Sequence, residues 1–394
     1  ISLSNLTDER MRMAKSGDWW VDNQQRALSN NSVCYTERPD MGIFMKEWLS
    51  LYESKSGERG IFNRASAQVK AAANGRRDGN IDFGTNPCCE IILRPYQFCN
   101  LSEVICRADD TIETLKNKIK LATMLGTFQS TLTDFGYLRK RWKDTTEEER
   151  LLGVSLTGIM DCPAVYDASP EALQQLRDVA VKTNKKLAEK LGINQSTAVT
   201  CVKPSGTVSQ LVNAASGIHA RHNPHYVRTV RGDNKDPLTM FLKDKGIPSE
   251  PDFTAPDNVT VFSFPMKSPE GAICRYDMSA LAQLELWLKI ADNYCEHKPS
   301  VTISVKENEW LEVGAWCWEH FDSLSGISFL PFSDHSYKQA PYQDIDKEAF
   351  KELTEKMPPA IDWYELQDYE KEDTTTGSQE LACAGGVCEI VDIG

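Results

Sequence analysis

Short apolar runs typical of strands alternate with longer segments of helical periodicity along most of the sequence. The spacing of apolar residues predicts helices at 40–52, 111–135, 170–191, 279–294 and 308–321. Shorter runs predict strands at 90–93, 100–106, 198–202, 259–264, 300–305 and 326–330. Strands that alternate with helices usually pair in parallel, so this order predicts an α/β fold, either a barrel or an open sheet.

Size and charge narrow the class of protein further. A chain of 394 residues with 41% hydrophobic residues can bury a large core in one big domain or two ordinary ones. Its net charge of −13 argues against broad affinity for nucleic acid or for anionic membranes. No stretch of 18 apolar residues and no signal-peptide pattern is found in the sequence, so we expect a cytoplasmic protein with neither nucleic acid nor membrane as partner.

Two adjacent cysteines stand out in the stretch TNPCCEIIL, residues 85–93. If this stretch is extended, alternation places Asn86, Cys88 and Glu90 on one face and Cys89 on the other. A thiol between an amide and a carboxylate can attack a bound hydroxylated substrate or abstract hydrogen from it. The alternative is a buried strand start, because free cysteine is among the most buried residue types.

A third cysteine follows in RPYQFCNL, residues 94–101. Pro95 indicates a turn, and the next strand carries Cys99. A return strand would bring Cys99 back towards Cys88, although the sequence alone does not establish that pairing.

The C-terminal segment has a different composition from the rest. From Leu366 it is first acidic and then rich in Thr, Gly and Ser, which predicts a flexible tail at 366–394 after a catalytic part at 1–365. Cys383 and Cys388 are separated by AGGV, a linker flexible enough for a reversible disulfide. A zinc pair and an incidental disordered tail are the alternatives, and zinc is disfavoured because no further ligands are nearby.

The stretch TAVTCVKPSGTVSQL, residues 197–211, reads as a strand, a turn and the start of a helix. Hydroxyl groups and free backbone N–H groups at such a turn can bind phosphate. An ordinary helix N-cap is the alternative, since the P-loop pattern is absent. The histidines that follow lack metal-ligand spacing, so no metal site is predicted. The residues assigned to phosphate binding are Pro204, Ser205, Gly206 and Thr207.

Taken together, four motifs in this order resemble the adenosylcobalamin-dependent (class II) ribonucleotide reductases, of the monomeric ribonucleoside-triphosphate type. The motifs are NPCCEIIL with FCNLSEV, LGVSLTGIMD, CVKPSGTVSQL and CAGGVC. The resemblance implies a ten-stranded α/β barrel with a central finger loop. It also implies reduction of ribonucleoside triphosphates to 2′-deoxyribonucleoside triphosphates, with adenosylcobalamin as cofactor.

The resemblance further implies roles for the matching residues. Cys88 would carry the thiyl radical that abstracts the 3′ hydrogen, Glu90 would be the base for the 3′-hydroxyl, and Asn86 would bind the substrate. Cys99 would be one of two thiols that supply electrons as the 2′-hydroxyl leaves as water. The residues from 204 to 207 would hold the nucleotide phosphates. The tail pair, Cys383 and Cys388, would reduce the resulting disulfide and be re-reduced by thioredoxin or a similar protein.

Two departures from this family are visible. Cys89 occupies a position where relatives usually have glycine. Relatives also have a large N-terminal part that supplies early strands, the partner thiol of Cys99 and an effector site. None of these is identifiable here, so we expect either a fragment or an N-terminal half supplied in trans.

Two other classes of protein remain open. A class I ribonucleoside-diphosphate reductase large subunit is disfavoured because its C-terminal Tyr-Tyr pair is absent. The DxHxxG sequence of base-off cobalamin proteins is also absent, which is compatible with the base-on binding of class II enzymes. The last alternative is a non-catalytic half-barrel or thiol redox protein.

Overall fold

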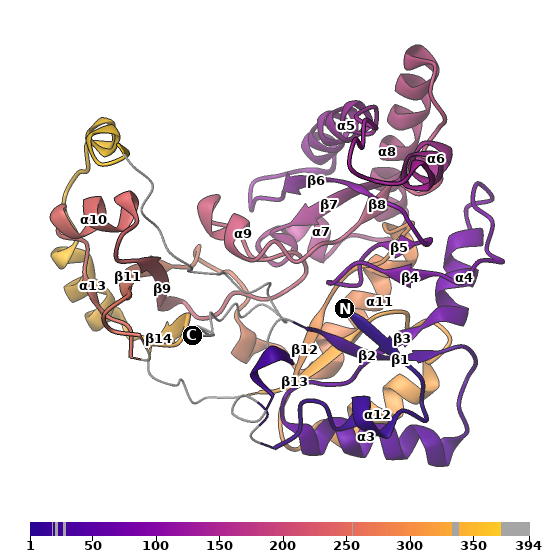
Figure 1. Ribbon diagram of the computed structural model, residues 1–394, viewed down its shortest axis with the longest axis horizontal. Helices are drawn as coiled ribbons and strands as arrows, with labels where there is room; N and C mark the ends of the chain where they lie inside the picture. The colour runs from indigo at the N-terminus through magenta and orange to yellow at the C-terminus, as the bar shows by residue number, and fades with distance from the viewer. Residues whose placement is uncertain (18, 20–22, 27–28, 254, 333–338, 372–394) are drawn as a thin grey trace. The chain divides into compact units, whose positions relative to one another are not determined.

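The computed structural model describes residues 1–17, 19, 23–26, 29–253, 255–332 and 339–371, with the side chains of Gln24 and Thr207 left out (Figure 1). The chain divides into two compact units. Unit 1 contains residues 1–220 and 278–332, and unit 2 contains residues 221–277 together with the described part of 333–394. The tail cysteines, Cys383 and Cys388, lie outside the described residues, and the domain boundary at 365/366 stays a prediction.

Unit 1 is built on parallel strands. One sheet has the order β1-β2-β3, with β1 at Ser2–Ser4, β2 at Asn31–Tyr35 and β3 at Gly60–Asn63. A second has the order β6-β7-β8, with β6 at Asn100–Ile105, β7 at Leu152–Thr157 and β8 at Thr200–Cys201. A third pairs β12, Thr302–Val305, with β13, Ser328–Pro331. The predicted parallel α/β pattern is therefore confirmed for unit 1.

Isolated bridges connect these three sheets into one strand order. Ile61 of β3 pairs in antiparallel fashion with Ile327, next to β13, and Val202 after β8 pairs in parallel with Pro299 before β12. The resulting order is β1-β2-β3-β13-β12-β8-β7-β6, with one antiparallel junction. The described residues do not close this order into a ring.

Helices cover the sheets of unit 1, and α5 packs against β6, β7 and α8 (Figure 1). All five predicted helices are present, most of them within two residues of the predicted ends, while the helix predicted at 111–135 ends at Gln129. They are α3 Met41–Ser54, α5 Ile112–Gln129, α8 Pro170–Leu191, α11 Ala280–Asn293 and α12 Trp310–Glu319. Side chains of Asp40, Thr111, Ser169 and Ser279 cap four of them. The remaining helices of unit 1 are α1 Glu9–Arg12, α4 Arg64–Ala72, α6 Lys140–Glu149, α7 Pro163–Tyr166, α9 Thr207–Leu211 and the 3-10 turns η1 Gln24–Arg26 and η2 Ile159–Asp161.

A short hairpin projects the paired cysteines. Strand β4, Gly84–Thr85, pairs in antiparallel fashion with β5, Ile92–Leu93. Residues 86–91 form the loop between these strands, which we call the finger loop. The predicted strand at 90–93 is thus shorter than expected.

Unit 2 differs from the predicted parallel pattern because its sheet is antiparallel. The order is β10-β11-β9-β14, with β9 at His225–Asp233, β10 at Ser249–Pro251, β11 at Val259–Lys267 and β14 at Tyr342–Asp344. Helix α13, Lys347–Lys356, packs on β9 and β11. The other helical elements are α10 Pro237–Asp244, η3 Arg275–Asp277 and η4 Trp363–Asp368. The sequence analysis predicted only β11 of this sheet.

Candidate active site

The finger loop is a closed turn, so the extended conformation predicted for residues 86–90 is wrong. The N–H of Cys89 donates to the carbonyl of Asn86 at 3.0 Å, and Cys89 has a left-handed φ of 64°. The Asn86 Oδ1 accepts from the N–H of Ile91 at 3.0 Å, and the Thr85 hydroxyl donates to the Ile91 carbonyl at 2.9 Å. Pro87 restricts the first step of this turn, and the left-handed residue completes it.

Cys88 and Glu90 nevertheless lie together, because both contact a lysine from another part of the chain. The Lys203 ammonium is 3.7 Å from the Cys88 Sγ and 3.4 Å from the Glu90 Oε1. Lys203 follows β8, whereas the finger loop lies between β4 and β5. A thiol, a carboxylate and an ammonium group therefore meet at one point of unit 1.

The carboxylate of Glu90 is the most enclosed member of this group. Its side chain is 0% exposed, whereas that of Lys203 is 34% exposed. The Glu90 Oε2 is buried and has no hydrogen-bond partner among the described residues. Burial would lower the pKa of Lys203, but the charge of Glu90 and the nearby Cys88 raise it overall. The lysine is therefore charged at neutral pH and lies beside the buried Glu90 side chain.

The Cys88 side chain is partly buried and neutral at neutral pH. Burial raises the pKa of the Cys88 thiol, Glu90 raises it further, and Lys203 opposes both effects. The group is thus an S–H donor and not a thiolate nucleophile. This favours hydrogen-atom chemistry over nucleophilic attack.

Cys89 faces a different lysine. A Cβ on Gly326 would lie 2.9 Å from the Cys89 Cβ and 2.8 Å from the Lys298 ammonium, so these three residues pack closely. Lys298 is buried, donates to the Ser325 carbonyl and lies 4.8 Å from the centre of the Phe62 ring. Burial lowers the pKa of Lys298 to about 8. Cys89 therefore packs beside Gly326 and Lys298 and, like Cys88, is only partly exposed.

The segment that carries Lys298 also anchors the hairpin. The N–H of Ile92 donates to the His297 Nδ1 at 3.3 Å, and the His297 Nε2 lies 3.0 Å from the Leu152 carbonyl of β7. Burial lowers the pKa of His297, so the ring is neutral and donates from Nε2. The backbone N–H of Lys298 adds a bond of 3.0 Å to the carbonyl of Glu90. These contacts fix the finger loop against the parallel sheet.

Cys99 lies just before β6 and packs against a small apolar cluster. The cluster consists of Ile91, Leu151, Ala198 and Cys201. Burial raises the pKa of the Cys99 thiol. The strand register places Cys201 level with Ser155 and Glu103, which is four residues along β6 from Cys99. Cys99 and Cys201 are both free thiols in this structure.

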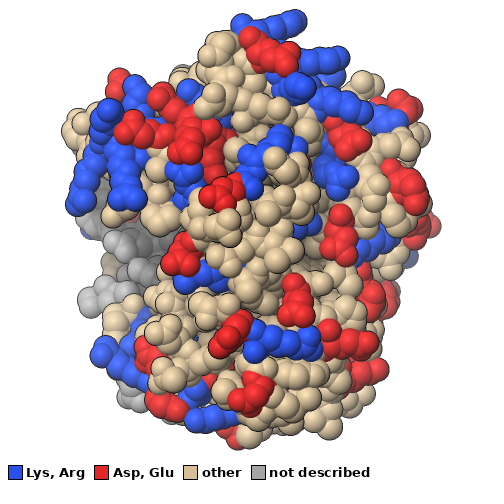
Figure 2. All heavy atoms as spheres, turned by 90° about the vertical axis from the view of Figure 1, so that its right-hand side faces the viewer, with Lys and Arg blue, Asp and Glu red and all other residues tan. Residues whose placement is uncertain are grey.

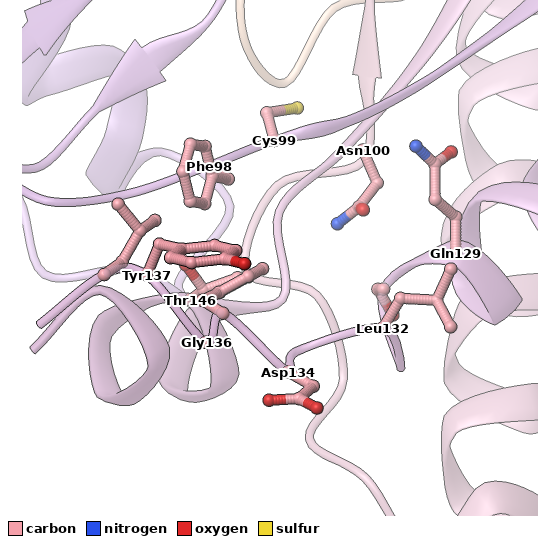
Figure 3. A pocket seen from close by; sticks show the side chains of 12 residues that line it. Phe98, Cys99, Asn100, Gln129, Leu132, Asp134, Gly136, Tyr137 and Thr146 are labelled. Carbon is pink, nitrogen blue, oxygen red and sulfur yellow. The ribbon is translucent and has the colours of Figure 1, made fainter. Parts of the chain in front are cut away.

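A pocket of about 460 Å³ lies beside Cys99 and is lined mainly by the segment after α5 (Figure 3). Phe98 points into it beside Tyr137, whereas the Cys99 thiol points to the other side of the chain. Phe98 also stacks on Trp142 with a centroid distance of 4.8 Å. The aromatic side chains of the pocket and the Cys99 thiol therefore lie on opposite sides of this segment.

The predicted phosphate-binding residues follow Lys203, and we call residues 203–207 the serine loop. The Ser205 hydroxyl donates to the Glu103 carboxylate and lies 2.8 Å from the Thr157 hydroxyl. The N–H of Gly206 donates to the Ser216 hydroxyl at 3.0 Å. Gly206 has a φ of 51° and precedes Thr207, the first residue of α9. The hydroxyl and the N–H already have protein partners, so phosphate would have to replace them.

Sequence reasoning missed three residues that shape this site, Lys203, His297 and Lys298. The sequence motifs assign no role in the site to any of these three residues. They lie far from the finger loop in sequence, and only the strand order brings them to it. The one signal in the sequence was the polar pair His297 and Lys298, which lies just before the strand predicted at 300–305.

Three further observations concern metal binding, membrane-spanning helices and surface charge. Among the described residues no group of three or more His, Cys, Asp or Glu side chains is placed to hold a metal ion. No helix in that part of the chain is both long and apolar enough to cross a membrane. On the face drawn in Figure 2, acidic and basic side chains are interspersed.

Known proteins with similar sequences share one activity in their names. The adenosylcobalamin-dependent ribonucleoside-triphosphate reductase of Lactobacillus delbrueckii subsp. bulgaricus is 26% identical over 93% of this chain and 53% of its own length. That of Euglena gracilis is 28% identical over 77% and 42%, and the probable enzyme of Dictyostelium discoideum is 29% identical over 78% and 40%. No family model matches.

The chain is homologous to adenosylcobalamin-dependent ribonucleoside-triphosphate reductases. It spans about half the length of these curated relatives. A B12-dependent (class II) ribonucleotide reductase structure matches with a TM-score of 0.75 and 22% identity over 95% of this chain and 55% of its own. The class Id ribonucleotide reductase alpha subunit of Actinobacillus ureae matches with a TM-score of 0.52 and 14% identity over 84% of this chain and 70% of its own. The α/β fold is therefore that of the reductases, and the predicted resemblance is confirmed.

Proposed function

We propose that this chain supplies the catalytic site of an adenosylcobalamin-dependent ribonucleoside-triphosphate reductase, which makes 2′-deoxyribonucleoside triphosphates. The observation that carries the proposal is the meeting of Cys88, Glu90 and Lys203 at the tip of an anchored hairpin. The homologues named for this activity cover 77–93% of the chain, which supports the same conclusion.

The chemistry of Cys88 fits the proposed cofactor. Adenosylcobalamin, when bound, supplies a radical that can take a hydrogen atom from a thiol. Because burial and Glu90 raise the pKa of Cys88, the side chain retains the S–H hydrogen that such a step needs. Cys88 is the residue in this chain that the cofactor would have to reach.

The other residues of the finger loop would then act on the ribose. The Cys88 thiyl radical would remove the 3′ hydrogen, and the Glu90 carboxylate would accept the proton of the 3′-hydroxyl. Asn86 already uses its Oδ1 to close the loop, which leaves its amide N–H₂ to bind a substrate hydroxyl. As the 2′-hydroxyl leaves as water, Cys99 and a second thiol would supply two electrons and two protons and form a disulfide.

The serine loop would bind the triphosphate. Ser205, Gly206 and Thr207 lie at a strand-to-helix turn, where N–H groups and hydroxyls favour anions, and Pro204 fixes the backbone before them. On binding, the Ser205 hydroxyl would exchange its Glu103 contact for a phosphate oxygen. Burial raises the pKa of Glu103, which lowers the cost of protonating this carboxylate next to an anion.

A ten-stranded barrel would complete the strand order of unit 1. The order has eight strands, and its antiparallel junction between β3 and β13 is compatible with two parallel halves. We propose that an N-terminal half, in cis or supplied in trans, adds strands beside β1 or β6 together with the second thiol. The 394 residues alone are then expected to be inactive, and robust turnover by them would contradict this part of the proposal.

The tail cysteines would carry electrons from thioredoxin or a similar protein to the disulfide at Cys99. Changing Cys383 and Cys388 to serine together is expected to stop multiple turnover with thioredoxin. Turnover with a small dithiol should remain, because such a molecule reaches the site directly. Equal loss with both reductants would contradict the shuttle role.

The direct test of the proposed function is deoxynucleotide formation by the complete enzyme. The reaction would contain a ribonucleoside triphosphate and a dithiol, with and without adenosylcobalamin, and the product would be separated by chromatography. We expect product only with the cofactor. Reduction of diphosphates without cobalamin, driven by a second protein subunit, would favour the class I alternative. Thiol exchange without deoxynucleotide formation would favour a redox protein.

A further inference from the structure

Lys203 has contacts that the proposed reaction does not yet use. Its ammonium reaches both the Cys88 Sγ at 3.7 Å and the Glu90 Oε1 at 3.4 Å. These residues are 115 and 113 positions away in sequence, and both lie in the finger loop. One side chain therefore connects the thiol and the base of the proposed site.

The backbone at Lys203 is held on both sides. Its N–H donates to the Ser155 hydroxyl of β7 at 2.8 Å. Its carbonyl lies so close to Gly217, which has a φ of 55°, that a Cβ there would be 2.7 Å away. These contacts hold the backbone of Lys203 through β7 and Gly217, independently of the finger loop. Lys203 can therefore act as a fixed point towards which the loop is placed.

The next residues of the chain form the serine loop. Pro204 and Ser205 follow directly, and the Ser205 hydroxyl contacts Thr157 of β7 at 2.8 Å. The segment that would hold the triphosphate thus also holds the lysine that contacts the thiol and the base. Few residues separate the two ends of the proposed substrate site.

We propose that Lys203 is the positioning residue of this site, which holds the Cys88 thiol beside the Glu90 carboxylate and is the charge partner of that carboxylate. The proposal rests on the proposed function. Glu90 is fully buried and Lys203 lies 3.4 Å from its carboxylate, so removal of the ammonium group leaves this buried group without that charge partner. Because Lys203 acts through Cys88 and Glu90, its removal should lower kcat more than it changes KM.

The decisive experiment does not depend on reductase activity. The folded 394-residue chain would be alkylated with iodoacetamide over a range of pH, and the Cys88 peptide would be followed by mass spectrometry. Since Lys203 opposes the raised pKa of Cys88, Lys203→Met should slow Cys88 alkylation by about tenfold at pH 8. Lys203→Arg should restore the rate, because it keeps the positive charge.

Controls separate positioning from a purely structural role. Lys116→Met removes another partly buried lysine that pairs with a glutamate, Glu113, and should leave the Cys88 rate unchanged. If Lys203 only braced the loop, its loss would expose Cys88 and speed alkylation at every pH. An unchanged or faster rate in Lys203→Met would therefore overturn the proposal. If Lys203→Met does not fold, the alkylation rate of Lys203→Gln is compared with that of Lys203→Arg instead.

Activity then distinguishes this inference from the proposed function. If the complete enzyme forms no deoxynucleotide, the proposed function is wrong. The alkylation rates would still test whether Lys203 acts on the Cys88 thiol. An active enzyme whose Lys203→Met variant keeps wild-type kcat would overturn the positioning role alone. We expect a loss of at least about tenfold in kcat, with partial recovery in Lys203→Arg.

Discussion

The two sides of the finger loop carry the same pair of groups, a cysteine and a lysine, in different surroundings. On one side Cys88 meets Lys203, whose side chain is 34% exposed, together with the Glu90 carboxylate. On the other side Cys89 meets Lys298, which is 2% exposed and bonded to a carbonyl. The lysine on the first side is partly exposed, whereas the lysine on the second side is buried. The partly exposed Lys203, which contacts both the Cys88 thiol and the Glu90 carboxylate, therefore distinguishes the proposed reactive thiol from Cys89.

The largest effect is expected from Glu90→Gln on the Cys88 side. This change keeps the shape of the side chain but removes the base and the charge that faces Lys203. We expect kcat for deoxynucleotide formation to fall by about 10²–10⁴-fold. The matched control is Glu103→Gln, a glutamate that contacts the serine loop and not Cys88. Equal losses in the two variants would remove the special role of Glu90.

On the Cys89 side the expected effect is on stability. Burial lowers the pKa of Lys298 from 10.5 to about 8. At pH 7 the lysine is therefore still charged in the folded protein, and the burial of this charge lowers the free energy of unfolding. Lys298→Met should therefore raise the free energy of unfolding at pH 7 by about 1–3 kcal/mol. Between pH 8 and 10.5 the folded protein releases this proton before the unfolded chain does. The difference in the free energy of unfolding between Lys298→Met and wild type should therefore shrink as pH rises.

Denaturant unfolding of both proteins at pH 7 and pH 9 measures this difference. The control change Lys116→Met should show no such pH dependence, because Lys116 is partly exposed and pairs with Glu113. A Lys298→Met variant that is less stable at pH 7 would mean that the lysine has a stabilising role in the finger loop.

A smaller effect is expected where the Cys88 side meets the phosphates. Ser205→Ala removes one hydroxyl of the serine loop and should raise KM for the triphosphate about fivefold, with kcat nearly unchanged.

Glu103 is expected to set the pH dependence of the KM for the triphosphate. As pH falls through its raised pKa, this carboxylate becomes neutral and repels phosphate less, so KM should fall. Glu103→Gln should flatten that profile, and a profile unchanged by it would exclude Glu103 as the cause.

The smallest effect concerns the backbone at Cys89. Its φ of 64° costs about 1–2 kcal/mol for a residue with a Cβ, and more for a branched one. Cys89→Gly should change the free energy of unfolding by no more than about 1 kcal/mol, whereas Cys89→Val should lower it by more than that. Thermal unfolding of the two variants gives the comparison. Equal stability would show that the left-handed turn carries no strain.

The sequence predicted the helices of unit 1 and the identity of the reactive side chains better than their geometry. Apolar periodicity located α8 to the residue, since a long helix depends on local spacing. Alternation placed Cys88 with Glu90, and the structure brings them together, but through a turn and Lys203. Such a contact depends on strand order over more than 110 residues, which no local pattern encodes.

The antiparallel sheet of unit 2 was missed for a related reason. Strand β9 runs through HYVRTVRGD, where charged residues interrupt the apolar alternation and give it the appearance of a basic loop. Its pairing with β11 and β14 supplies the order that its own sequence does not indicate. The alternation of predicted strands and helices indicated parallel pairing for the whole chain, whereas the motifs that carry the resemblance lie in unit 1 or in the tail.

The most direct measurement compares Cys88→Ser with Cys89→Ser in the complete enzyme. Both changes replace a thiol by a hydroxyl, at adjacent positions that face different lysines. Cobalamin-dependent deoxynucleotide formation should be lost in Cys88→Ser and should stay within a few-fold of wild type in Cys89→Ser. Activity that survives in Cys88→Ser, or that is lost equally in both variants, would contradict the assignment of Cys88 as the reactive thiol.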